Sequence, residues 1–151
     1  MYQRILLAID GSHASQLALE QTAMIGQATG AEVEALFVAD DTDAFFDPVG
    51  YDAAALTERI LEYGRETLAH AAARLQAAGV PHTTKLLEKP VSPGKISATI
   101  VAEADTSGAD LIVLGTHGRR GLKHMVMGSV AEGVVHKTNK PVLMVRSEAE
   151  S

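Results

Sequence analysis

Short apolar segments rich in leucine and β-branched residues alternate along this chain with longer segments of helical periodicity. The segments expected to form strands are residues 4–9, 33–38, 83–87, 111–114 and 142–145. The first, fourth and fifth are nearly continuous apolar runs, which is typical of strands covered on both faces. The alternation predicts an α/β fold with one open, five-stranded parallel sheet, right-handed crossovers and helices on both faces.

Apolar residues recur every three or four positions between these segments, which predicts amphipathic helices. The expected helices cover residues 14–28, about 52–78, 96–104 and about 129–137. Ser12 is a suitable N-cap for the first helix, and Gly30 stands where its C-cap would be. The acidic segment 40–52 lies outside this scheme and carries Phe45, Phe46 and Tyr51. It is expected to be either a surface loop or a lid, and the sequence leaves both open.

Length and charge limit the class of protein. The 151 residues are enough for one core, so we expect residues 1–151 to form a single domain. A net charge of −6 argues against nucleic-acid binding, which depends on cationic side chains that neutralise phosphates. No apolar run approaches the ~20 residues of a membrane span. The chain has no cysteine, which suits a reducing compartment, so we expect a cytoplasmic protein.

A glycine-rich, basic stretch, GTHGRRGLKHMVMGS, follows the fourth expected strand. Gly115 and Gly118 can adopt positive φ and present backbone N–H groups to an anion. Gly128 and Ser129 come at the start of a helix, where free N–H groups and the helix dipole favour a phosphate. Glycine clusters also mark ordinary tight turns, and the residues alone leave that alternative open.

The first strand runs into Asp10, which is suited to a ribose hydroxyl or a metal-bound phosphate. The two strand ends would flank one crevice if the strand order is 3-2-1-4-5, whereas the order 2-1-3-4-5 would separate them. Other motifs do not fit. A P-loop and the G-x-G-x-x-G dinucleotide fingerprint are excluded by spacing, and the neighbours Asp10, Ser12 and His13 cannot readily form a hydrolytic triad. No metal ligands are assigned.

The spacing Gly115-x2-Gly118-x9-Gly128-Ser129 resembles the universal stress protein family, in the branch that binds ATP through a G-x2-G-x9-G-[ST] motif. The resemblance extends over ILLAIDGSHAS, ALFVAD, GADLIVLGTHGRRGLKHMVMGSVAEGVV and KPVLMVR, which together span nearly the whole chain. It implies a Rossmann-like sheet with the order 3-2-1-4-5. It also implies a homodimer that forms through the strand at residues 142–145.

The resemblance assigns binding roles by position. Ala8 and Val38 would line the adenine pocket, and Asp10 would meet the ribose or the phosphates. The remaining implied residues surround the phosphates and the ribose: Gly115, His117, Gly118, Arg119, Gly128, Ser129 and Val130.

The expected ligand is ATP, or AMP or ADP, with or without Mg²⁺. The protein would then be a regulatory or stress-resistance module whose nucleotide state a partner protein reads. Two alternatives remain at this stage: a slow ATPase or autokinase, and a nucleotide-free dimer that works through protein contacts.

Overall fold

The computed structural model describes residues 2–39, 53–88, 95–116 and 128–147. The strands are β1 (Arg4–Ala8), β2 (Glu32–Val38), β3 (His82–Leu87), β4 (Leu111–Gly115) and β5 (Val142–Val145). The described helices are α1 (His13–Thr29), α3 (Ala53–Ala77), α4 (Ile96–Ser107) and α5 (Ser129–Lys137). The predicted strands and helices are therefore confirmed to within a few residues at their ends. Segment 40–52, with the choice between surface loop and lid, lies outside the described residues.

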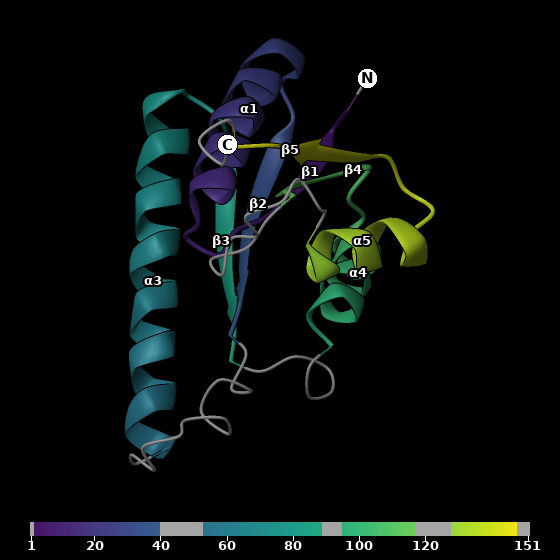
Figure 1. Ribbon diagram of the computed structural model, residues 1–151. Helices are drawn as coiled ribbons and strands as arrows, with labels where there is room; N and C mark the ends of the chain where they lie inside the picture. The colour runs from purple at the N-terminus through teal and green to yellow at the C-terminus, as the bar shows by residue number, and fades with distance from the viewer. Residues whose placement is uncertain (1, 40–52, 89–94, 117–127, 148–151) are drawn as a thin grey trace.

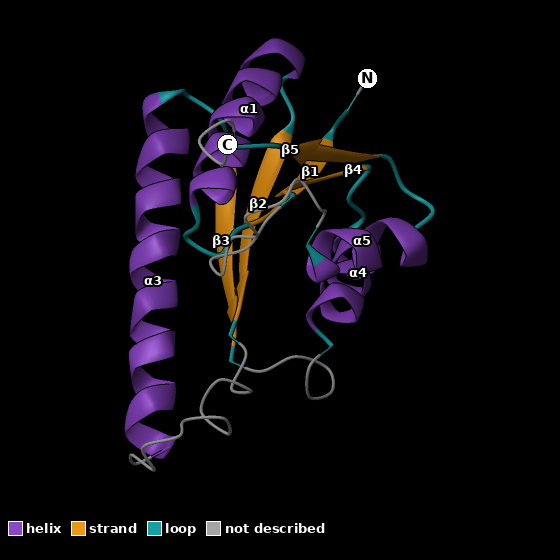
Figure 2. Ribbon diagram, viewed as in Figure 1, coloured by secondary structure: helices purple, strands orange, loops and turns teal. Residues whose placement is uncertain are grey.

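All five strands are parallel and lie in the order β3-β2-β1-β4-β5. This confirms the expected order 3-2-1-4-5 and rules out 2-1-3-4-5. Helices α1 and α3 cover one face of the sheet and α4 and α5 cover the other (Figures 1 and 2). Because β1 and β4 are parallel neighbours, their carboxyl ends lie side by side at one edge of the sheet.

The core is divided between the two faces by the period-two alternation of the strands. Ile5 and Leu7 of β1 pack on the α1 and α3 side together with Phe37 of β2. Leu6 of β1 and Ile112 of β4 pack on the opposite side, beneath α4 and α5. Central strands buried on both faces explain why β1 and β4 read as continuous apolar runs.

Both predicted caps of α1 are confirmed. The Ser12 hydroxyl accepts a hydrogen bond from the Ser15 N–H at 3.1 Å, and Gly30 ends the helix in the left-handed conformation with φ 75°. The Gly30 N–H donates to the Gly26 carbonyl at 2.9 Å. These caps place the start of α1 beside the end of β1. None of the helices in the described part of the chain has the length and apolar character to cross a membrane.

Candidate functional site

The Asp10 turn, residues 9–12, joins β1 to α1 at the carboxyl edge of the sheet. Asp10 Oδ1 accepts a hydrogen bond from the Ser12 N–H at 2.9 Å, and the Asp10 N–H donates to Ser15 Oγ at 3.1 Å. Gly11 has φ 83°, a conformation that glycine adopts without steric cost. The turn therefore holds a half-buried carboxylate at the edge where β1 and β4 end.

Gly115, the last residue of β4, lies directly against the first turn of α1. A Cβ atom at this position would be 2.7 Å from Ala14 Cβ and 2.8 Å from the Ala14 carbonyl carbon. The end of β4 and the start of α1 are thus in contact at the edge where the sequence predicted a crevice. The expectation of a positive φ at Gly115 is wrong, because the described glycines with positive φ are Gly11, Gly30, Gly79 and Gly108. The close approach of α1 is what requires glycine here.

The start of α5 is fixed to the end of β4. The Gly128 N–H donates to the Thr116 carbonyl at 2.6 Å, and the Thr116 N–H donates to the Val145 carbonyl at 3.0 Å. Gly128 is the N-cap of α5 in an extended conformation, with no side-chain cap, and Ser129 is exposed. The first N–H groups of a helix lack intrahelical partners and carry the positive end of the helix dipole. This arrangement suits an anion.

Three predicted apolar site residues lie on one face of the sheet. Ala8, Val38 and Val130 are partly buried and pack against the core cluster beneath α4 and α5. Ala8 is in register with Leu36, and Val38 with Leu87, so the first two come from adjacent strands near their carboxyl ends. The structure thus brings an apolar wall and the Asp10 turn to the same edge.

The other predicted residues of the loop, His117, Gly118 and Arg119, lie outside the described residues. Among the residues that the structure does describe, no three His, Asp or Glu side chains are grouped so as to hold a metal ion.

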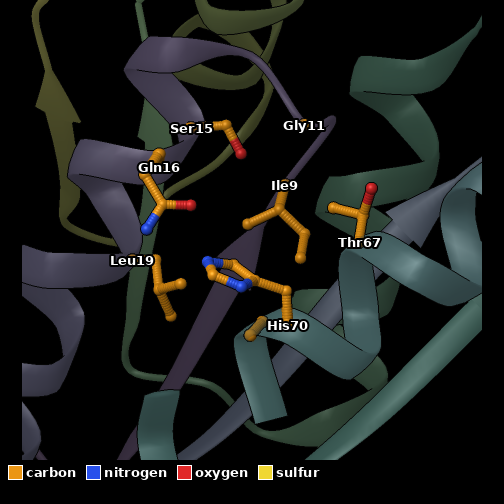
Figure 3. Close-up of a pocket in the computed structure, with 8 residues that line it drawn as sticks. Ile9, Gly11, Ser15, Gln16, Leu19, Thr67 and His70 are labelled. Atoms are coloured by element: carbon orange, nitrogen blue, oxygen red, sulfur yellow. The ribbon is translucent and has the colours of Figure 1, made fainter. Parts of the chain in front are cut away.

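A shallow hollow lies behind the Asp10 turn, on the α1 and α3 side of the sheet. Figure 3 shows the His70 side chain of α3 extending toward α1, with Ile9 and Gln16 facing the same space. None of the predicted site residues in the described part of the chain lines this hollow. Sequence reasoning missed it because α1 and α3 are far apart in the chain and neither segment carries a recognisable motif.

Sequence reasoning also missed a polar cluster at the interface between the sheet and α4. The Lys85 ammonium donates to Glu103 Oε1 at 2.9 Å, and Glu34 on β2 hydrogen-bonds to the same glutamate. Burial, the hydrogen bond and charge repulsion from Glu103 raise the pKa of Glu34 from 4.5 to about 7. The hydrogen bond to Glu103 raises the pKa of Lys85.

A proton on Glu34 is needed for its hydrogen bond to Glu103. Two ionised carboxylates only accept hydrogen bonds, and Glu34 Oε1 is buried without a hydrogen-bond partner among the residues that the structure describes. The protonated form of Glu34 is therefore favoured up to its raised pKa of about 7.

Comparisons with known proteins agree with this architecture. Residues 1–146 match the sequence model of the Universal stress protein family. The chain is 34% identical to universal stress protein MJ0531 of Methanocaldococcus jannaschii over 146 residues, which is 97% of this chain and 83% of that protein. It resembles the solved structure of hypothetical protein MJ0577 from the same organism, with a TM-score of 0.84, 28% identity and 98% of both chains covered. A universal stress protein from Archaeoglobus fulgidus, solved in complex with dAMP, gives a TM-score of 0.68 at 25% identity, covering 95% of this chain and 98% of that one.

Proposed function

Because the chain belongs to the universal stress protein family, we propose that it binds an adenine nucleotide, ATP or else AMP or ADP, where β1 and β4 end. One observation carries this proposal. Contacts at Gly115 and Thr116 hold the Asp10 turn and the start of α5 at the same edge of the sheet. A relative solved with dAMP supports the choice of an adenine nucleotide.

The residues present fit the parts of a nucleotide. The free N–H groups at the start of α5 and the Ser129 hydroxyl would bind phosphate. The second oxygen of Asp10, which has no hydrogen-bond partner among the described residues, would accept from a ribose hydroxyl or meet a phosphate-bound Mg²⁺. Ala8 and Val38 would contact adenine, with Val130 beside the sugar. His117, Gly118 and Arg119 would complete the phosphate loop, as the sequence motif implies.

We further propose that the protein is a cytoplasmic homodimer whose nucleotide state is read by a partner protein. The strand β5 supports the dimer, because it ends the sheet at one side and its four residues are only half-buried. The carbonyls that face β4 belong to odd-numbered positions: the Ile112 N–H donates to Pro141 O at 3.0 Å, one residue before β5, and the Thr116 N–H, one residue after β4, donates to Val145 O at 3.0 Å. By this alternation, Val142 and Met144 direct their backbone groups away from β4 and toward a second copy.

Mass spectrometry of the small molecules released from freshly purified, denatured protein tests nucleotide binding. We expect an adenine nucleotide in stoichiometric amount from the parent, none from Gly128→Val and a reduced amount from Asp10→Ala. The matched control is Asp105→Ala, which removes an aspartate on α4 remote from this edge. The Asp105 side chain is 67% exposed, and its carboxylate lies 3.9 Å from the Lys140 ammonium, a weak ion pair. No released nucleotide, together with no thermal shift on adding ATP, would instead favour a dimer that works with the site empty.

A further inference from the structure

The side chain of Tyr63 covers Gly11 from α3. A Cβ atom built on Gly11 would lie 2.6 Å from Tyr63 Cζ and 2.8 Å from Cε2, and it would overlap the Oη atom. The ring therefore fills the space that a side chain at Gly11 would occupy. One turn further along α3, Thr67 lines the hollow that Gly11 also borders (Figure 3). Helix α3 thus faces the Asp10 turn at two successive turns.

Packing against the sheet fixes the position of the Tyr63 ring. The ring meets Phe37 of β2 edge to face, with centroids 6.2 Å apart and an interplanar angle of 66°. The neighbouring Gly64 brings α3 close to the sheet, because a Cβ there would lie 2.7 Å from Phe37 Cδ1 and 3.0 Å from Leu86 Cδ1. Phe37 is itself 3% exposed. The ring is therefore held by the core.

The Asp10 carboxylate depends on the conformation of Gly11. The hydrogen bond from the Ser12 N–H to Asp10 Oδ1 spans Gly11 and is formed with φ 83° at that residue. Glycine populates positive and negative φ about equally, so the chain itself does not select this conformation. The Tyr63 ring limits the alternatives by occupying one side of the turn.

We propose that Tyr63 is a positioning residue that holds the Asp10 carboxylate in place for the nucleotide through Gly11, and so couples α3 to occupancy of the site. This inference rests on the nucleotide-binding function proposed above. Nucleotide binding at Asp10 stabilises the turn that Tyr63 covers, and movement of α3 would in return change nucleotide affinity, since coupling between two sites is reciprocal.

The test compares ATP dissociation constants of three full-length variants by isothermal titration calorimetry. Tyr63→Leu keeps apolar volume on the core but cannot reach Gly11, and we expect ATP affinity to fall about tenfold through lost preorganisation. Tyr63→Phe retains Cζ and Cε2 beside Gly11, so it should bind ATP more tightly than Tyr63→Leu. Leu68→Ala removes a buried side chain of the same helix away from Gly11, so it should lower thermal stability and leave ATP affinity unchanged.

A double-mutant cycle with Asp10→Ala separates positioning from general loosening. If Tyr63 acts through Asp10, Tyr63→Leu should have no further effect on ATP affinity in the Asp10→Ala background. An equal loss in both backgrounds, or parent affinity in Tyr63→Leu, would overturn the role of Tyr63 while leaving nucleotide binding intact. A parent chain that binds none of ATP, ADP and AMP would overturn the proposed function itself.

Discussion

Replacing Glu34 with glutamine should change how the stability of this protein depends on pH. Glu34 lies on β2 beneath α4, where it hydrogen-bonds to Glu103, and Glu103 also accepts a hydrogen bond from Lys85. Charges that face Glu34 come from α4 through Glu103, from β3 through Lys85 and from its own strand through Glu32. Glutamine has nearly the same shape and no charge at any pH, so it isolates the ionisation of this one carboxyl.

The sign of the effect follows from proton binding. The pKa of Glu34 is about 7 in the folded chain against an ordinary value of 4.5, so the folded chain binds more protons between these pH values. The free energy of unfolding therefore falls as pH rises through this window and is constant above it. The full difference corresponds to at most about 3.4 kcal/mol. Because Glu34 is only partly buried, water screens the interaction, and we expect about 1 to 2 kcal/mol.

Urea denaturation of the parent and of Glu34→Gln at several values between pH 5 and pH 8 measures this change. The free energy of unfolding of the variant should rise relative to the parent by that amount across the series. A fixed difference in packing cancels in such a comparison. The matched control is Glu66→Gln, an exposed glutamate on α3 that is not among the charges acting on Glu34, and it should follow the parent. Parallel pH profiles for Glu34→Gln and the parent would show that the pKa of Glu34 is not raised in the folded chain.

Three further substitutions test separate parts of the structure. Gly115→Ala should lower the free energy of unfolding by about 1 to 3 kcal/mol in urea titrations, because its methyl group overlaps Ala14; unchanged stability would contradict the close approach of α1. Ser12→Ala should cost about 1 kcal/mol in the same assay by removing the cap on the Ser15 N–H, whereas no loss would mean that the cap is replaced by water. Met144→Pro removes a backbone N–H of β5 that points away from β4, so this variant should be a monomer in light scattering. The control Met144→Ala should remain dimeric. A dimeric Met144→Pro variant would mean that the interface lies elsewhere.

The sheet could be predicted because its central strands are buried on both faces. Leu111 and Val113 face one helical layer and Ile112 and Leu114 the other, so all four positions need apolar side chains and the strand is visible as an unbroken run. The caps of α1 could be predicted because they are local, each depending on residues within one turn. The strand order followed from the family resemblance, since the residues alone left two orders open.

Contacts between distant segments could not be predicted. Glu34 alternates with buried Val33 and Ala35, so the sequence of β2 suggests a solvent-facing glutamate. Its carboxyl is covered because α4, which is distant in sequence, packs on that face of the sheet and places Glu103 next to Glu34. Tyr63 likewise reads as one more position on a helix, and nothing near it in sequence points to Gly11. Such pairings depend on how the helices cross the sheet, which periodicity does not fix.

Two glycines of the motif lie in the described part of the chain, Gly115 at the end of β4 and Gly128 at the start of α5. They are glycine for different physical reasons. Gly115 is required by the contact between β4 and α1, so a chain with this sheet and this close approach would keep glycine there with or without a nucleotide. Gly128 has φ −66° and ψ 156°, a conformation open to any residue, so its backbone places no demand for glycine. A ligand that approaches the first N–H groups of α5 would occupy the space of a side chain at Gly128 and would therefore require glycine there. Gly128, not Gly115, is therefore the position whose substitution discriminates nucleotide binding from folding.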